Sequence, residues 1–138
     1  MKKLVRFGVS IEKDLLMRFD RLIKERRYSN RSEAFRDLIR RELIKKQWKE
    51  GKQVAGAITF VFNHHRREIL DKIIHAQHDF QKLIISTQHV HLDHDNCLEI
   101  IALKGSAKEA EALADAIRAI KGVMHGELSM SSTGAGIS

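Results

Sequence analysis

The apolar positions at the start of the chain predict a short strand followed by a helix. In "LVRFGVSI", Val5, Phe7 and Val9 alternate with small or polar residues, which is typical of a half-buried strand. Apolar residues then recur at helical spacing over residues 15–23 and form one stripe. We expect Ser10 to cap this helix, because its hydroxyl can accept a hydrogen bond from a free backbone N–H.

A second helix follows. Asn30, with Glu33 three residues later, predicts a capping box at its N-terminus. Gly51 is expected to end it, because glycine readily adopts the left-handed conformation found after helix ends. One strand and two helices bury little surface, and a lone strand has no ladder partner. The segment therefore predicts a dimer in which two strands pair antiparallel into a two-stranded ribbon.

The second half of the chain alternates between strand and helix patterns. The predicted strands are "VAGAITFVF", "LIISTQHVHL", "CLEIIALKG" and "VMHGELSMS", and the predicted helices are "HHRREILDKIIHAQHDF" and "SAKEAEALADAIRAIKG". In the first of these helices, Ile69, Leu70, Ile73 and Ile74 are expected to point inward. The order β-α-β-β-α-β is that of a ferredoxin-like sandwich, with both helices on one face of a four-stranded sheet.

The predicted fold class is thus α+β, with a ribbon-helix-helix unit followed by a ferredoxin-like βαββαβ domain. We expect the first domain to span residues 1–50 and a linker to span residues 51–53. The ferredoxin-like domain should span residues 54–132, and residues 133–138, which are small and polar, should form a flexible tail.

Composition narrows the class of protein. No apolar run approaches the roughly 18 residues of a membrane helix, and the start has no secretory apolar core. The single cysteine excludes an internal disulfide and fits a cytoplasmic location. Charge is uneven: residues 1–50 hold 16 Lys and Arg against 8 Asp and Glu, while all eight histidines lie in the second half. The first half is therefore suited to binding a polyanion, and the second half to binding a ligand through its histidines.

The basic half has the features of a DNA-binding surface. Ribbon-helix-helix proteins insert a two-stranded ribbon into the major groove, so side chains on the outer face of the strand must reach base edges. Arg6, Gly8 and Ser10 occupy that face, and Arg6 can make a bidentate contact with guanine. Arg31 and Ser32, at the N-terminus of the second helix, are placed to anchor phosphate.

A candidate metal site lies in "QHVHLDHDNCLEI". Residues two apart on a strand share a face, so His89 and His91 project together. A connection of odd length sets Cys97 opposite His91 and adds Glu99 to the same face. The apolar residues favour this register, because they then share the other face, which we expect to pack against the helices: Val90, Leu98 and Ile100. The His/Cys face would then be free to meet another subunit.

Two imidazoles and a thiolate supply three ligands, and a tetrahedral or square-planar site needs a fourth. His78 is the leading candidate, with His75 and His94 behind it. The histidines that we interpret as ordinary surface residues are His64, His65, His94 and His125.

Together these motifs resemble the nickel-responsive regulators, which join a ribbon-helix-helix domain to a C-terminal ACT-type domain. The resemblance covers nearly the whole chain and is strongest in "NRSEAFRDLIR", "STQHVHLDHDNCLEI" and "LKG". It implies one square-planar Ni(II) per subunit, held by His89, His91 and Cys97 of one subunit and His78 of a neighbour.

The resemblance also carries expectations about DNA and a second cation. It implies base reading by the strand residues named above and adds Asn30 to the phosphate anchors. A secondary cation site between the two domains would use Glu33 and Asp37. Two positions depart from the family pattern: Gly8, where a contacting hydroxyl is common, and Phe62, where some members carry tyrosine.

The expected function is that of a homotetrameric repressor, a dimer of dimers. Nickel would increase its affinity for double-stranded, pseudo-palindromic operator DNA that controls nickel uptake. The alternative is a metal-independent repressor or antitoxin of the same N-terminal type, whose C-terminal domain binds a protein partner or small ligand. A metallohydrolase ranks last, because Glu99 is the only evident general base and the basic half would have no purpose. The chain is thus not expected to be an enzyme.

Overall fold

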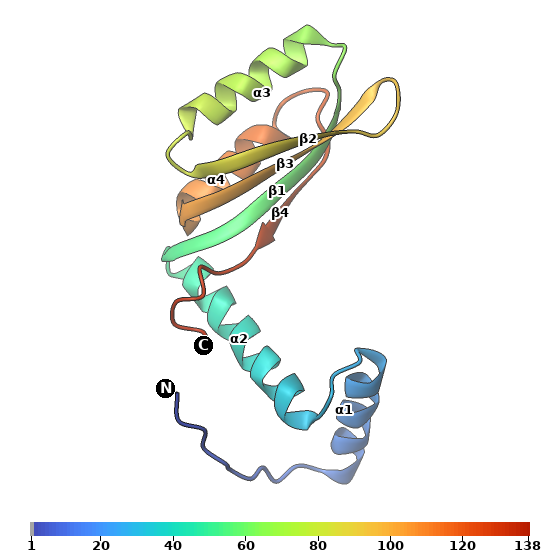
Figure 1. Cartoon of the computed structure of the whole chain (residues 1–138), viewed down its shortest axis with the longest axis vertical. Coiled ribbons are helices and arrows are strands. Elements are labelled where there is room, and N and C mark those ends of the chain that lie inside the picture. Colours follow the sequence, from blue (N-terminus) through green and yellow to red (C-terminus); the bar gives the residue numbers. More distant parts are fainter. Residues whose placement is uncertain (1) are drawn as a thin grey trace. The chain divides into compact units, whose positions relative to one another are not determined.

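The structure is a computed structural model that describes residues 2–138. The chain divides into two compact units, the first ending at Ile39 and the second running from Arg40 to Ser138 (Figure 1). The fold class agrees with the expectation: a ribbon-helix-helix unit is followed by a four-stranded antiparallel α+β domain consistent with an ACT-type fold. Within residues 2–138 no helix is long and apolar enough to cross a membrane.

The first unit contains helix α1 (Lys13–Glu25) and the start of helix α2 (Arg31–Lys49). Residues 2–12 carry no assigned strand, and Val5, Phe7 and Val9 are all exposed. The reason is that a single chain offers this segment no ladder partner, and an unpaired strand is not stable in water. The segment therefore exposes its apolar side chains and has no strand partner within residues 2–138.

The two helix starts differ from each other. Asn30 caps α2 as predicted, its side-chain oxygen accepting from the Glu33 backbone N–H at 2.9 Å. The prediction that Ser10 caps α1 is wrong, because the cap position is Glu12, which makes no side-chain capping bond. The spacing of apolar residues predicted a helix here, but several polar residues precede it and each could be the cap. The backbone conformation, which the sequence pattern does not give, decides which of them is the cap residue. Gly51 lies beyond α2 with φ of 70°, as expected of a glycine at a helix end.

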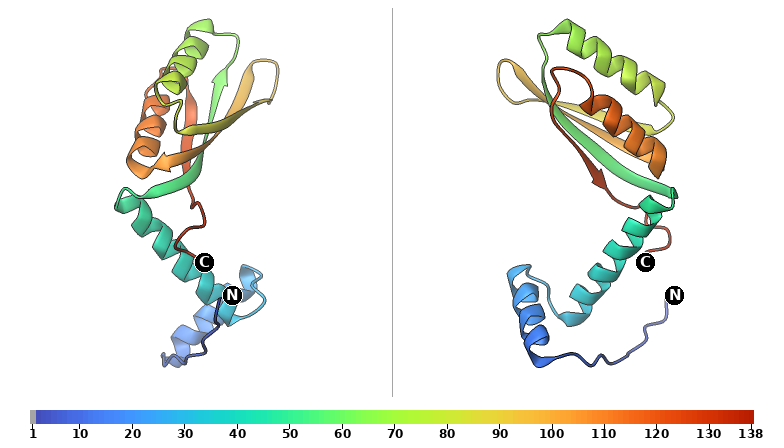
Figure 2. Two further views of the ribbon diagram at one scale, coloured as in Figure 1. Left: turned by 60° about the vertical axis from the view of Figure 1, so that its left-hand side comes forward. Right: turned by 180° about the vertical axis from the view of Figure 1, so that it is seen from behind.

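The second unit is the predicted βαββαβ sandwich. Its strands are β1 (Gln53–Asn63), β2 (Ile84–His91), β3 (Asn96–Ser106) and β4 (Met124–Met130), in the order β2-β3-β1-β4. Helices α3 (Arg67–Asp79) and α4 (Ala107–Arg118) lie on the same face of this sheet (Figure 2). Ser106 caps α4 by accepting from the Glu109 backbone N–H at 3.2 Å.

The hydrophobic core lies between that face and the two helices. It contains Phe60 and Phe62 of β1, Ile101 and Leu103 of β3, and Ile73 of α3. One inward prediction on α3 is wrong: Ile74 is 57 % exposed, whereas its neighbour is 1 % exposed. Both are isoleucine, so composition could not distinguish them, and the angle at which α3 packs on the sheet decided which is buried.

The predicted assignment of sheet faces is also wrong. Cys97 and Glu99 lie on the core face of β3, each 1 % exposed, whereas Leu98 and Ile100 are only partly buried on the other face. The two faces of β3 are both largely apolar, so alternation could not show which one the helices cover. On β1, Phe60 and Phe62 pair with Glu99 and Cys97 and belong to the core, so the face of β3 that carries Cys97 packs against the helices.

Candidate metal centre and DNA-binding surface

The β2–β3 hairpin has the register that the sequence predicted. His91 pairs with Cys97, His89 pairs with Glu99, and Val90 pairs with Leu98 between them. Residues 92–96, an odd number, separate His91 from its partner Cys97. Since alternate residues share a face, His89, His91 and Cys97 belong to one face of the hairpin, the face that continues into the core.

Asp93 holds the turn of this hairpin. Its carboxylate accepts from the backbone N–H groups of Asp95 and Asn96 at 2.9 and 2.8 Å. These bonds lower the pKa of Asp93, the bond from the Asn96 backbone N–H contributing most. The turn therefore fixes the register that sets the cysteine opposite a histidine.

Glu99 is a buried carboxyl group held between a strand and a helix. The Glu99 side chain lies 2.6 Å from His89 Nε2 and accepts a 3.0 Å hydrogen bond from the Gln77 amide of α3. Burial raises the pKa of Glu99, against the opposing effects of the Gln77 bond and the His89 charge. Gln77 thus holds the Glu99 carboxylate, a role that no sequence motif indicated. The only signal in the sequence was the position of Gln77, two helical turns after Ile69 on the same helix.

Cys97 is a buried free thiol next to Phe62 in the sheet register. Burial raises the pKa of this thiol, and the neighbouring Glu99 charge adds to the effect. A thiol in this setting is a poor nucleophile at neutral pH and ionises readily only when a cation binds it. Two imidazoles and this thiol are a donor set that suits nickel, copper or zinc, so the residues fit such an ion.

The proposed ligands are not gathered into a closed site by one chain. Among residues 2–138, the only group of three metal-binding side chains within 4.8 Å of one another is His65, His94 and Asp95. The His89 ring is paired with Glu99, and the His91 ring stands edge-on to His64 at 4.9 Å. His78 is exposed in the last turn of α3, and His75, the other helix candidate, pairs with Asp79 at 3.6 Å.

The predicted base-reading residues Arg6, Gly8 and Ser10 all lie in the exposed segment before α1. A side chain added at Gly8 would meet nothing within 4 Å, so the backbone there has no local steric need for glycine.

The predicted phosphate anchors lie at the start of α2. Asn30 uses its side-chain oxygen for capping, and Ser32 is exposed. Arg31 makes two hydrogen bonds to the Asp20 carboxylate of α1, at 2.9 and 2.8 Å. Its guanidinium is thus already paired with a carboxylate, which a phosphate would have to displace or share.

The residues predicted for a secondary cation also have partners. The Asp37 carboxylate accepts from the Tyr28 hydroxyl, and the Glu33 carboxylate pairs with Arg36. Carboxylate oxygens can bind a hard cation while keeping such partners, because each has more than one lone pair.

Comparison with known proteins agrees with this architecture. The family model described as "NikR C terminal nickel binding domain" matches residues 55–131, and that described as "Ribbon-helix-helix protein, copG family" matches residues 5–46. Among solved structures, an uncharacterized protein of Thermotoga maritima superimposes with a TM-score of 0.51 at 17 % identity, covering 56 % of this chain and 95 % of that one. This likeness concerns the fold alone.

Sequence relatives extend the match to nearly the whole chain. A chain of Syntrophus aciditrophicus named as a nickel-responsive regulator is 60 % identical over 97 % of this chain and 98 % of its own length. One of Chlorobium limicola with the same name is 56 % identical over 97 % of this chain and all of its own.

Proposed function

This chain belongs to the family of nickel-responsive regulators, and we propose that it is a repressor. Its affinity for operator DNA increases when Ni(II) binds at a site shared between subunits. As a member of that family it is a DNA-binding regulator and not an enzyme. The finer proposal has three parts: the ligands, the assembly and the coupling to DNA.

The proposed ligands are His89, His91 and Cys97 of one subunit with His78 of a neighbour. The observation that carries this proposal is the pairing of His91 with Cys97 across the hairpin, with His89 two residues from His91 on the same face of β2. Among residues 2–138, the side chains of His89, His91 and Cys97 do not form a closed group, so the proposed ion would draw them together and take its fourth ligand from a neighbouring subunit. Bound nickel would supply a Lewis acid that stabilises the thiolate of Cys97. One ion per subunit follows if each hairpin holds one.

The proposed assembly is a homotetramer, a dimer of dimers. The exposed apolar side chains of residues 4–11 support dimerisation through a ribbon, which would bury them. The same ribbon would present Arg6, Gly8 and Ser10 to base edges, while the start of α2 anchors phosphate. Such an assembly acts where chromosomal DNA is, so its proposed location is the cytoplasm.

The proposed coupling follows from the sharing of one site by two subunits. A cation that needs donors from two subunits binds best in the arrangement that brings them together. If that arrangement also spaces two ribbons to fit a pseudo-palindromic operator, nickel raises affinity for DNA. The genes repressed would then be those of nickel uptake.

A gel-shift titration on promoter DNA tests the proposal. We expect nickel to lower the apparent Kd of the wild type by at least tenfold, and to have no effect on Cys97→Ala. His75→Ala, which removes an exposed histidine outside the proposed ligand set, is the matched control and should respond like the wild type. Equal binding by all proteins with and without nickel would instead support the metal-independent repressor.

A further inference from the structure

The chain after β4 turns back along the second half of helix α2. Figure 1 shows it leaving β4 and running beside the end of that helix. Three of its backbone carbonyls accept hydrogen bonds from α2 side chains: Ser131 from Trp48 Nε1, Ala135 from Gln47 Nε2 and Ile137 from Arg40 Nε, at 2.9, 2.9 and 3.1 Å. We call residues 131–137 the strap. Its contacts follow α2 backwards and all lie within the second compact unit.

The strap has a backbone path that its own residues define. The Ser132 hydroxyl accepts from the Gly134 backbone N–H at 2.9 Å, and the Thr133 hydroxyl accepts from that of Ala135 at 3.3 Å. Gly134 and Gly136 have φ of 92° and 75°, a conformation that residues with side chains rarely adopt. The small and polar residues of this segment thus shape the turns that bring its carbonyls to α2.

The strap lengthens the part of α2 that is attached to the sheet domain. Trp48 is buried in the core, and Ile44 packs against the same cluster. The helix between these two residues is about 6 Å long at 1.5 Å per residue. Arg40, Ile44 and Trp48 follow one another at i, i+4 spacing and so share one face of α2. The Arg40 bond extends the attached length to about 12 Å, and a longer base restricts how far the helix can tilt.

The docked strap leaves one polar atom buried. The side-chain oxygen of Gln47 is buried and has no hydrogen-bond partner among residues 2–138, although the nitrogen of the same amide donates to Ala135. An unpartnered buried oxygen costs free energy, which offsets part of the gain from the three bonds. Release of the strap would expose this oxygen to water. The docked and released forms are therefore close enough in free energy for a modest change elsewhere to shift their balance.

We propose that the strap is a coupling element: docked on α2, it holds the helix at a fixed angle to the sheet domain and so transmits metal binding to the DNA-binding unit. This role rests on the proposed function. The boundary between the two units falls within α2, which begins at Arg31 in the first unit and ends at Lys49 in the second. A change in the second unit thus passes along the chain through this helix. A helix that pivots on its last turn would lose that change, and a strapped helix keeps it.

Two variants release the strap from opposite sides. The double variant Arg40→Met, Gln47→Ala removes two donors from α2 and keeps Trp48 in the core. Gly136→Val places a branched side chain at a φ of 75°, where an added Cβ would already lie 3.3 Å from Gln47 Nε2. The matched controls are Lys49→Met, which removes a charge from an exposed position of α2, and Ser138→Ala, which changes an exposed residue beyond the contacts. Far-UV circular dichroism of each full-length variant checks that it is folded.

Amide hydrogen exchange without metal or DNA tests whether the strap holds the helix. We expect the amides of residues 40–49 to exchange faster by roughly threefold or more in both strap variants, because their local opening becomes easier. The two controls should exchange like the wild type. Equal exchange in all five proteins would overturn the strap as an attachment of α2, and this result does not depend on nickel.

Operator binding with and without Ni(II) tests the coupling. If nickel increases the affinity of the wild type by about tenfold, we expect a gain of less than about threefold in the strap variants. The ratio is compared because the loss of the Arg40 charge affects both affinities alike. Nickel titration of the DNA-free proteins should give one affinity for all of them, since the proposed ligands are unchanged.

The outcomes separate the coupling role from the proposed function. A full gain in the strap variants, beside a full gain in the wild type, would overturn the coupling role and leave the proposed function intact. A wild type that gains nothing from nickel would overturn the proposed function and the coupling role together, and hydrogen exchange would still decide whether the strap holds α2.

Discussion

At the scale of single residues, Glu99 is a carboxylate that the sequence offered as a candidate general base but that contributes to the packing of the fold. It is buried between Gln77 of α3 and His89 of β2. A buried carboxyl group is costly unless its oxygens have partners, so these two side chains make its position tolerable. It also links helix α3 to the strand that carries two of the proposed nickel ligands.

Gln77→Ala tests this role. The substitution leaves one oxygen of a buried carboxyl group without its donor, so we expect the free energy of unfolding to fall by about 1–3 kcal/mol. Urea unfolding measures it. Gln81→Ala, an exposed glutamine just after α3, should change it by less than about 0.5 kcal/mol. Similar effects for both variants would show that the bond to Glu99 does not matter for stability.

The Asp20–Arg31 pair gives a pH-dependent prediction. The hydrogen bond that the Asp20 carboxylate accepts from Arg31 lowers the pKa of Asp20. A carboxylate whose folded pKa is depressed stabilises the fold above its unfolded pKa, about 3.9, and loses that contribution as pH falls through the folded value. Arg31→Met should therefore raise the pKa of Asp20 towards its ordinary value, as measured by NMR titration of the carboxyl signal.

The same pair predicts how stability differs between the two proteins. The difference in free energy of unfolding between wild type and Arg31→Met should be largest above pH of about 4 and should shrink below it. It should also shrink with added salt, since both side chains are exposed. A difference that grows on acidification would contradict the assigned ion pair.

At the scale of elements, helix α3 shows what periodicity leaves open. The sequence stripe offered four apolar side chains, and the sheet covers Ile69 and Ile73 but not Ile74. An exposed apolar residue is not unusual by itself.

Two neighbouring isoleucines provide a matched pair of substitutions on α3. Ile73→Ala removes a side chain from the core, so we expect it to destabilise the protein by about 2–5 kcal/mol. Ile74→Ala should change the free energy of unfolding by less than about 0.5 kcal/mol. Thermal or urea unfolding compares them. A large loss for Ile74→Ala would show that another subunit covers this residue in solution.

The C-terminal tail is a second element for which the structure shows contacts that composition did not predict. Backbone carbonyls of Ser131, Ala135 and Ile137 accept hydrogen bonds from side chains of α2, at 2.9, 2.9 and 3.1 Å. Flexibility of residues 133–138 in solution stays a prediction, which amide hydrogen exchange can measure. The donors are Trp48, Gln47 and Arg40, so the tail lies against the second half of that helix.

At the scale of the whole molecule, the uneven charge indicates that DNA binding and cation binding belong to different halves of the chain. The positive balance lies in residues 1–50, which contain the segment predicted to form the ribbon and helices α1 and α2. Binding to DNA through cations releases counterions, so affinity should fall steeply with salt. The histidines and the single cysteine lie in the other half, where a cation rather than a polyanion is the suitable ligand.

Salt dependence of operator binding tests the phosphate role of Arg31. If Arg31 contacts one phosphate per subunit, Arg31→Met should reduce the slope of log K against log salt by about 0.9 for each such contact. Fluorescence anisotropy on operator DNA measures the slope. Lys121→Ala removes the same charge from the C-terminal unit and should leave the slope unchanged; equal slopes for all three proteins would mean that Arg31 stays with Asp20.

The sequence alone determined the order of the helices and strands after residue 12, the cap at Asn30 and the register of the hairpin. These features depend on local rules: spacing of apolar residues, side-chain to backbone bonds within a turn, and the odd length of a connection. The predicted ligands His89, His91 and Cys97 could be placed on one face for the same reason.

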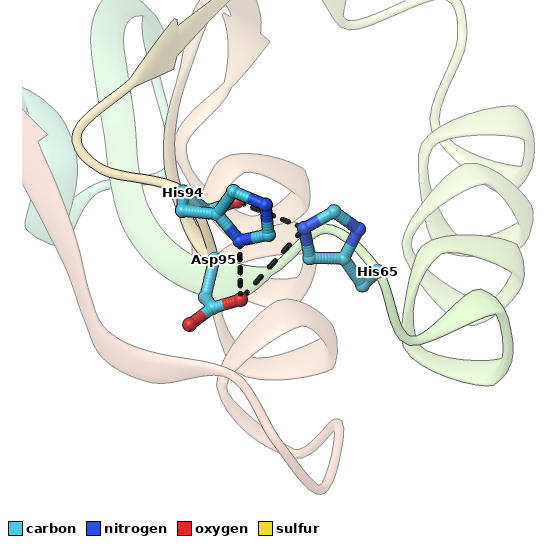
Figure 3. A group of neighbouring side chains, drawn as sticks. All are labelled: His65, His94 and Asp95. Atoms are coloured by element: carbon cyan, nitrogen blue, oxygen red, sulfur yellow. Dashed lines mark hydrogen bonds and ion pairs between the residues drawn. The ribbon is translucent and has the colours of Figure 1, made fainter.

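Only the tertiary structure decided which face of β3 is buried, that Ile74 is exposed, and that His65 meets His94 and Asp95. Each of these depends on what packs against or approaches an element from elsewhere in the chain. Both faces of β3 are largely apolar, so local pattern is equally compatible with either orientation. His65 and His94, which lie next to each other in Figure 3, are 29 residues apart in the chain. No sequence periodicity connects residues across that distance.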